Sequence, residues 1–454
     1  MTIFIKRSDF LAKTAWINCR LFHEKLDEWL ISTILVNEKG RIIDVLSENS
    51  GDLSGYTIKD ARQAYVIPGL INAHAHLFAS GAPSTKKYPI PLINSAYRLL
   101  NTSLGLAILR KIMKKHALIE LQSGVTTIRS VGEFFYQDVR LRDRFTEEAN
   151  SWPDLLTSGF FLSTTGGHGA PYLALETDSP WEGRKNVRKN VRQGVDWIKI
   201  CVTGGVTDAR RIGEAGALQL TEPEIAAICD EAHKNKMMVA AHVQSTEGVR
   251  IALKAGVDTI EHGAPMDDEI IALFKNNPQA LRGYSALMPT FQAAAPFAML
   301  DKETLGLNPV TIENGRLVYE GMLEGLQQAI AHHITWGVGN DASMTFVPHY
   351  DFWRELAITA AAAGLAPKEM IQRATAGNAA ILGIDHEVGT IAPDKKANFI
   401  LLEKNPHEDL RALTKLQAVV KEGQLVKGKP IKRFTELDQL MDQVLQRIKE
   451  TAVQ

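Results

Sequence analysis

Residues 68–76 read Pro-Gly-Leu-Ile-Asn-Ala-His-Ala-His, a short apolar run that ends in two histidines separated by one residue. Before Pro68 the sequence consists of short β-type segments and turns. After it, apolar β-type segments, loops and helical patterns alternate. Side chains two residues apart on an extended chain point the same way, so His74 and His76 can both reach one metal ion. A His-x-His pair occurs often by chance, so its meaning depends on the rest of the chain.

The alternation of strand and helix continues through about 310 residues and predicts the fold class. The apolar segments end at Asn72, Ser130, Leu162, Cys201, Ala241, Glu261, Thr290 and Gly339, and helical patterns cover residues 106–122, 137–149, 222–234, 247–255, 267–275 and 314–333. Eight such alternations predict an α/β protein with a parallel sheet closed into a (β/α)8 TIM barrel.

Both ends of the chain have β-type sequence. Short strands are predicted at residues 16–22, 32–36, 42–46, 398–402, 417–421 and 424–426. We expect residues 1–66 and 389–433 to pair into one small β-sandwich domain beside a barrel of residues 67–388. Residues 434–454 should form a closing amphipathic helix, with one apolar stripe made of Leu437, Leu440, Met441, Val444, Leu445 and Ile448.

Composition excludes several classes of function. The 454 residues carry a formal net charge of −1, so bulk charge favours neither nucleic acid nor an anionic membrane as a partner. Cys19, Cys201 and Cys229 are odd in number and widely spaced, which argues against disulfides or a cysteine zinc site and fits a reducing compartment. Charged residues interrupt the first 30 positions, and no long apolar run is present. We therefore expect a soluble, cytoplasmic protein with a small-molecule partner.

Four more candidate ligands fall at or near the ends of predicted strands. They are Lys199 in Trp-Ile-Lys-Ile-Cys, His242 in Val-Ala-Ala-His, His262 in Thr-Ile-Glu-His-Gly and Asp341 in Gly-Val-Gly-Asn-Asp. The carboxyl ends of barrel strands form the face that carries active sites. A single strand-end histidine or aspartate is usually structural, but a lysine among apolar neighbours is rare, because burying its charge costs on the order of several kcal/mol. Together with His74 and His76, these residues predict one metal site.

At these residues the chain resembles the amidohydrolase superfamily, and within it the prolidase-like branch related to imidazolonepropionase. The resemblance covers nearly the whole chain and is carried by residues 66–76, 124–129, Lys199 with 203–206, the run from His242 to 255–263, and 374–376. It implies that carbon dioxide carboxylates Lys199 and that this carbamate bridges two divalent ions. His74, His76 and Asp341 would hold the first ion, and His242 and His262 the second. Zn²⁺ is the metal we expect, although the donors also suit manganese, iron or cobalt.

The resemblance also implies a mechanism in which a metal-bridging hydroxide attacks an amide carbonyl and Asp341 moves the proton to the leaving nitrogen. His168 lies on the glycine-rich stretch 164–169, where it could donate to an oxyanion or a substrate carboxylate, or could be a surface histidine. Further substrate contacts are expected from Thr207, Arg210, Tyr284 and Gln244. Close dipeptidase relatives often carry His or Tyr at the place of Gln244, which puts the substrate preference in doubt.

Three functions remain open at this point. The first is a binuclear hydrolase of C–N bonds, either a prolidase-like Xaa-Pro dipeptidase or an N-acyl amino-acid amidohydrolase. The second is a cyclic-amide (imidazolonepropionase-like) hydrolase or mononuclear deaminase, against which Lys199 argues, because one ion needs no bridging ligand. The third is a barrel that binds a small ligand without catalysis. The resemblance also implies a homo-oligomer.

Overall fold

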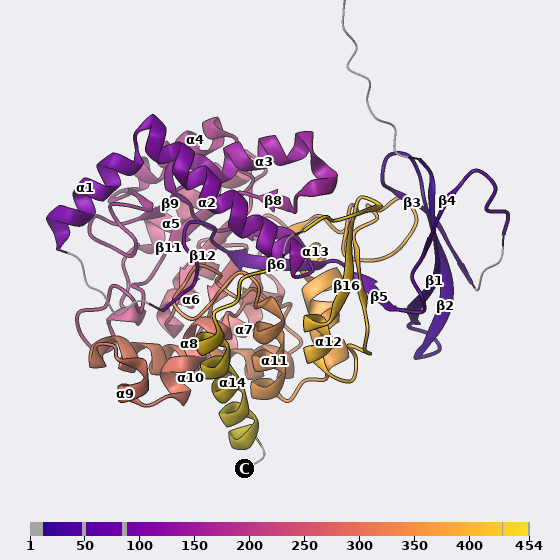
Figure 1. The fold of residues 1–454 in the computed structure, drawn as a ribbon. Helices are drawn as coiled ribbons and strands as arrows, with labels where there is room; N and C mark the ends of the chain where they lie inside the picture. Colours follow the sequence, from indigo (N-terminus) through magenta and orange to yellow (C-terminus); the bar gives the residue numbers. More distant parts are fainter. Residues whose placement is uncertain (1–11, 48–50, 84–88, 429, 453–454) are drawn as a thin grey trace, which may run out of the picture.

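The computed structural model describes residues 12–47, 51–83, 89–428 and 430–452. They form an α/β fold in which parallel, barrel-like sheets carry the helices and a mixed sheet from both chain ends lies beside them (Figure 1). Residues 1–11, part of the predicted β domain, lie outside the described residues, and the domain boundaries given above stay predictions. Among the described residues, no helix combines the length and apolarity needed to cross a bilayer.

Two parallel sheets make up the barrel-like part. One has the order β6-β7-β8 and the other β10-β9-β11-β12-β13-β14. Their bounds are β6 (Leu70–Ala75), β7 (Val125–Ser130), β8 (Asp154–Leu156), β9 (Phe161–Ser163), β10 (Ala174–Glu176), β11 (Ile198–Cys201), β12 (Val239–Val243), β13 (Thr259–His262) and β14 (Ala286–Met288). Every residue of β11, β12 and β13 is buried, as expected of strands enclosed by helices on one side and by the barrel interior on the other.

The eighth strand predicted to end at Gly339 is reduced to two parallel bridges, Leu287 with Trp336 and Ala75 with Ala342. The side chain of Asn378 here makes hydrogen bonds of the kind that a neighbouring strand would make. Its Oδ1 accepts from Val338 N, and its Nδ2 donates to Val338 O. These contacts still place residues 336–342 between β14 and β6, so that Asp341 lies beside the histidines of the first strand.

The predicted helices are present with small shifts at their ends, as α2 (Ser103–Gln122), α3 (Gln137–Glu147), α5 (Glu222–Lys234), α6 (Thr246–Lys254), α7 (Asp268–Lys275) and α10 (Pro309–Ala331). The start of α5 is sharply defined because Pro223 stands in its first turn and Glu224 accepts from Thr221 N at 2.8 Å. Helices that were not predicted are α1 (Ile90–Leu100), α4 (Pro180–Gln193), α8 (Phe291–Met299), α9 (Lys302–Leu305), α11 (Phe352–Ala363), α12 (Pro367–Gln372) and α13 (Asn378–Leu382). Short 3₁₀ or π turns occur at Phe134–Tyr136, Ala149–Ser151, Glu214–Gly216, Arg373–Gly377 and Leu410–Thr414.

Strands from both chain ends form one mixed sheet of order β17-β16-β15-β5-β1-β2-β3, with β4 paired to β1. They are β1 (Thr14–His23), β2 (Glu28–Val36), β3 (Ile42–Ser47), β4 (Thr57–Asp60), β5 (Tyr65–Pro68), β15 (Phe399–Leu402), β16 (Leu416–Lys421) and β17 (Gln424–Leu425). The two ends were expected to form a sandwich. They share a single sheet because β5 pairs with β1 on one edge and with β15 on the other. Trp16 and Phe399 pack edge to face at 5.5 Å in its core.

The closing helix is confirmed as α14 (Thr435–Ala452), which packs on α11 and α8. Five of the six residues of its predicted apolar stripe are buried, namely Leu437, Met441, Val444, Leu445 and Ile448. The helix therefore covers the outer side of two barrel helices.

A pair of buried histidines ties α2 to the segment that follows β6. The rings of His116 and His349 stack with centroids 4.3 Å apart. His116 Nδ1 lies 2.7 Å from Leu77 O, and His349 Nε2 lies 2.8 Å from Ala79 O, so both backbone carbonyls accept hydrogen bonds. Burial, helped by the neighbouring His349, lowers the pKa of His116 from 6.5 to about 3.

We predict that this pair makes the protein less stable in mild acid. Between pH 6.5 and pH 3 the unfolded chain binds a proton at His116 that the folded chain does not, so the free energy of unfolding falls as the pH falls. The slope from this one group is at most about 1.4 kcal/mol per pH unit. His116→Asn keeps a donor for Leu77 O but does not titrate. Urea unfolding at pH 7, 6 and 5 should therefore show a shallower loss of stability in His116→Asn than in the unmodified chain, and equal slopes would contradict the assignment.

Candidate metal centre

The six predicted metal ligands line one cavity at the carboxyl ends of the parallel strands. They are His74, His76, Lys199, His242, His262 and Asp341. All six are buried. They come from β6 and the residue just after it, from β11, β12 and β13, and from the segment bridged to β6. The closed arrangement of the strands thus gathers side chains that are far apart in the sequence.

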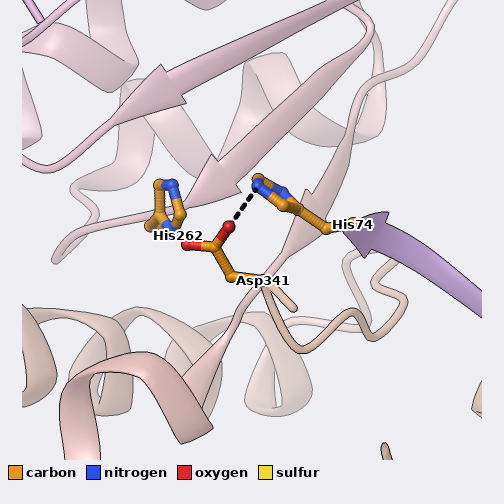
Figure 2. Close-up of side chains that lie close together, drawn as sticks. All are labelled: His74, His262 and Asp341. Atoms are coloured by element: carbon orange, nitrogen blue, oxygen red, sulfur yellow. Dashed lines mark ion pairs between the residues drawn. The ribbon is translucent and has the colours of Figure 1, made fainter. Parts of the chain in front are cut away.

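Three of the six lie closest together. One ligand atom from each of His74, His262 and Asp341 lies within 4.8 Å of the other two (Figure 2). Asp341 Oδ1 is 3.5 Å from His74 Nε2 and 3.3 Å from His76 Nε2. Imidazole nitrogens and a carboxylate oxygen in such a cluster are donors that a divalent ion such as zinc prefers.

Two of these three residues have an unusual backbone. His262 has a φ of 69° and Asp341 a φ of 59°, in the left-handed region that residues other than glycine rarely adopt. Such strained positions cluster at functional sites, because the surrounding structure must hold them there. The strain thus supports a role for these two side chains at the site.

Each of the four candidate-ligand histidines uses one ring nitrogen in a hydrogen-bond contact, and the second nitrogen of His74 and of His76 faces Asp341 Oδ1. The contacts are His74 Nδ1 to Glu261 Oε2 at 2.5 Å, His76 Nδ1 to Gly132 O at 2.7 Å, His242 Nε2 to Gly204 O at 2.8 Å, and His262 Nδ1 to Thr290 Oγ1 at 2.8 Å. Metal-binding histidines typically donate their second N–H in this way, which fixes the tautomer and the ring orientation. The nitrogens left for a metal are Nε2 of His74, His76 and His262, and Nδ1 of His242.

Glu261 anchors His74 from inside the barrel. It is fully buried and accepts two hydrogen bonds from Arg129 Nη2, each 2.8 Å long. Burial alone would raise the pKa of Glu261, but Arg129 and His74 outweigh it and hold that pKa well below its usual range. Glu261 therefore stays a carboxylate. This role of Glu261 was not predicted, although Glu261 directly precedes His262.

Lys199 is a buried cationic side chain that lies at this cavity. Its Nζ makes no hydrogen bond to any residue in the described part of the chain. Burial lowers the pKa of Lys199, although the negative charges of Glu261 and Asp341 oppose the shift. A neutral amine is the form that reacts with carbon dioxide. The buried amine therefore stands beside the histidine and aspartate group that could hold a metal ion.

Burial keeps the neighbouring imidazoles neutral. It lowers the pKa of His242 and of His262 well below 6.5, and nearby His168 and His74 contribute to the respective shifts. Neutral imidazole is the form that binds metal, so both rings are ready ligands at neutral pH.

His168 lies at the same cavity, where its ring stacks on that of His242 with centroids 4.4 Å apart. Its Nδ1 is 2.5 Å from Oδ2 of Asp208, a residue that the sequence analysis missed. The pKa of Asp208 is lowered overall. Burial alone would raise it, but the hydrogen bond and the charge of His168 outweigh that effect. A Cβ on Gly205 would lie 2.3 Å from the His168 ring, so only glycine leaves room for this ring position. The sequence could have pointed to Asp208 only because it directly follows Thr207, which was predicted to contact the substrate.

The predicted substrate residues divide into two groups. Thr207 and Gln244 line the cavity, and Gln244 Oε1 is buried without a partner in the described chain. Arg210 does not line it, because its side chain is exposed on a loop turned towards Glu214. Tyr284 also lies away from it, because it precedes β14 and so belongs to the opposite end of the parallel strands.

Much of the cavity lining is apolar and was not predicted, and we call this part of the lining the apolar wall. It consists of Phe78, Phe161, Leu173, Val206, Ala293, Phe297, Val318, Met322 and Met344. Several of these come from α8 and α10 rather than from strand ends. The cavity thus combines a polar group of candidate ligands with an apolar wall, as small-molecule sites generally do.

Comparison with known proteins agrees with this geometry. The model of the amidohydrolase family matches residues 65–426. A crystal structure of a candidate prolidase from Bifidobacterium longum is 39% identical, covers 96% of this chain and 99% of that chain, and superposes with a TM-score of 0.84. The structure of an Xaa-Pro dipeptidase with methionine bound in its active site is 27% identical over 92% of this chain and 100% of that chain, with a TM-score of 0.78.

Among curated proteins, the ochratoxinase of Aspergillus niger is 25% identical over 336 residues, which are 68% of this chain. The match spans 66% of that enzyme, so the chain covers about two thirds of its length.

We predict that Thr290→Val weakens metal binding. Valine has nearly the same shape as threonine but cannot accept from His262 Nδ1, so the ring loses the contact that fixes its orientation. Loss of such a supporting contact lowers metal affinity about 10- to 100-fold. Competition with a chromogenic chelator measures the affinity, and Thr290→Ser, which keeps the hydroxyl, serves as the matched control. Equal affinities in the Val and Ser variants would show that Thr290 does not support a ligand.

Proposed function

The chain belongs to the amidohydrolase family, and from this premise we propose that it is a binuclear metal-dependent hydrolase of amide C–N bonds. The observation that carries the proposal is Lys199 Nζ, which is buried and has no hydrogen-bond partner among the described residues, in the cavity that Asp341 and the four candidate-ligand histidines also line. A mononuclear site leaves such an amine unexplained. A carboxylated lysine shared by two ions accounts for it.

Carboxylation would resolve the charge problem of this lysine. The neutral amine attacks carbon dioxide, a new N–C bond forms, and the nitrogen loses a proton, which leaves an anionic carbamate with two oxygens. His74, His76 and Asp341 would hold one divalent ion, His242 and His262 the other, and the two carbamate oxygens would serve both. When bound, such ions make water nucleophilic at neutral pH and polarise a carbonyl group.

The protein's own residues supply the proton transfer and the orientation of the substrate. Burial alone would raise the pKa of Asp341, but His74 and His76 outweigh it and hold that pKa well below its usual range, so Asp341 is ionised in this site. We assign to Asp341 the transfer of a proton to the leaving nitrogen. Asp208 holds Nδ1 of His168, so Nε2 is the atom that His168 can offer to an oxyanion or a carboxylate of the substrate.

For the substrate we propose an Xaa-Pro dipeptide or an N-acyl amino acid. Two of the similar structures are described as prolidase or Xaa-Pro dipeptidase, and one of these holds an amino acid, methionine. The apolar wall beside the candidate ligands would receive the apolar part of such a molecule, including the ring of Phe297 and the side chains of Met322 and Met344.

A second candidate function rests on the compact group of His74, His262 and Asp341, which could hold a single ion without Lys199. A cyclic-amide hydrolase or a deaminase with one metal ion would use such a group. The number of ions bound per chain separates the two candidates.

We predict about two divalent ions per chain in protein reconstituted with Zn²⁺ and bicarbonate, and at most one in Lys199→Met. Methionine fills a similar volume but has no amine to carboxylate. The rate should fall on the order of 100-fold or more, the scale for removal of one group that stabilises charge at an active site. Lys275→Met, at an exposed position in the last turn of α7, is the matched control and should behave as the unmodified protein.

Metal content is measured by elemental mass spectrometry. Activity is measured on a panel of Xaa-Pro dipeptides, N-acyl amino acids, cyclic amides and amino-substituted heterocycles. Turnover of cyclic amides or heterocycles alone, with one ion per chain, would favour the second candidate. Full activity of Lys199→Met would contradict the binuclear proposal.

A further inference from the structure

The start of α8 is capped by a carboxylate that comes from another helix. Glu355 of α11 is fully buried; its Oε1 accepts from Phe291 N at 2.9 Å and its Oε2 from Gln292 N at 2.6 Å. These are the first two N–H groups of α8, and no earlier turn of the helix can satisfy them. A negative charge at this position also lies at the positive end of the helix dipole. Glu355 therefore supplies both the hydrogen bonds and the charge that the first turn of α8 needs.

Thr290, which stands where a capping residue would stand, is used elsewhere. It occupies the N-cap position of α8, but its side chain makes no hydrogen bond to the first turn. Its Oγ1 lies 2.8 Å from His262 Nδ1 instead. A threonine at an N-cap usually accepts from the second or third N–H of the helix, so α8 and His262 compete for this hydroxyl. Because Glu355 already accepts from Gln292 N, the hydroxyl of Thr290 is left for the ring of His262.

The composition of α8 makes it depend on support of this kind. It has nine residues, carries no acidic residue in its first turn, and contains Pro296, which lacks the N–H that would continue the helix ladder. Helices this short are marginal without tertiary packing, and α8 packs against α11 (Figure 1). Phe297 of α8 belongs to the apolar wall, so the cap also fixes this part of the cavity lining.

The charge in the cavity reaches Glu355. Burial raises the pKa of Glu355 to about 8 and the charge of Asp341 adds to the rise, while the two backbone N–H groups oppose it. Cations held beside Asp341 would offset that charge and favour the carboxylate, which is the form that accepts from both N–H groups. By linkage, the capped helix and the bound ions would then favour each other.

We propose that Glu355 is a positioning residue of the metal centre: by capping α8 in place of Thr290, it leaves the hydroxyl of Thr290 to orient His262. This role rests on the proposed function, in which His262 holds one of two ions. Glu355 does not line the cavity, so it acts through Thr290 and α8 rather than on the substrate.

The test is a double-mutant cycle of Glu355→Gln and Thr290→Val, with the affinity for Zn²⁺ measured in competition with a chromogenic chelator. Glutamine has the shape of glutamate, but its amide nitrogen cannot accept an N–H. Glu355→Gln should lower the affinity about 10-fold, the lower end of the range for loss of a contact that supports a metal ligand. In the Thr290→Val background the same substitution should change the affinity less than about two-fold, because the contact through which Glu355 acts is already gone.

Glu224→Gln is the matched control. Glu224 is also a buried glutamate that accepts a backbone N–H at the start of a helix, but that helix, α5, does not line the cavity. This variant should bind Zn²⁺ as the unmodified chain does. Reconstitution with Co²⁺ adds a spectroscopic signature: Glu355→Gln and Thr290→Val should shift the visible absorption of the bound ion in the same direction, and Glu224→Gln should leave it unchanged.

Two results would overturn the role of Glu355: an affinity in Glu355→Gln equal to that of the unmodified chain, or equal losses from Glu355→Gln with Thr290 and with Val at position 290. Failure of the proposed function is distinguishable, because the unmodified chain itself would then bind no Zn²⁺.

A milder variant covers the case in which circular dichroism shows that Glu355→Gln does not fold. Thr359→Val removes only the hydroxyl that donates to Glu355 Oε1 at 3.0 Å. The affinity should then fall at least about two-fold in the presence of Thr290 and stay the same in the Thr290→Val background. An equal change in both backgrounds would again overturn the proposal.

Discussion

A lysine amine inside a barrel must lose its charge, find a counter-charge or be modified, and this constraint governs the whole site. The fully buried carboxylate of Glu261 is already held by Arg129 and by His74. Asp341 faces His74 and His76 instead. Within the described chain Lys199 Nζ thus has no hydrogen-bond partner, while each of the four candidate-ligand imidazoles keeps one nitrogen that its supporting contact does not use. The site thus has several atoms that could bind metal ions. Two ions would occupy these atoms, and carboxylation of Lys199 would give its buried amine a role as a ligand.

The fold makes this constraint possible because the candidate ligands stand on rigid strands. Parallel strands end at the same face of the barrel. Cys201 of β11 is paired with His242 of β12, so the loops that follow these two strands start side by side. Behind the ligands, the Arg129–Glu261 pair and the carbonyls of Gly132 and Gly204 fix the rings. Most of the apolar wall and the His168 loop, by contrast, come from helices and connections, where side chains can vary without disturbing the candidate ligands.

Local patterns allowed much of this to be predicted, and long-range contacts explain the rest. The bounds of α5 follow from its periodicity and its capping residues, and the stripe of α14 from its spacing. The strand at Gly339 could not be foreseen as a pair of bridges, because Val338 bonds there to the side chain of Asn378, 40 residues away. Asp208 was missed for the same reason, since its partner His168 lies in another loop. Tyr284 was assigned to the cavity because sequence spacing does not tell which end of a short strand a flanking residue joins.

The most direct measurement is a crystal structure of the protein loaded with Zn²⁺, with data collected at the zinc absorption edge. We expect two anomalous peaks, one beside His74, His76 and Asp341 and one beside His242 and His262, with density for a carboxylate group continuing beyond Lys199 Nζ. An unmodified Lys199 that points away from the histidines, with no anomalous peak in the cavity, would contradict the binuclear centre.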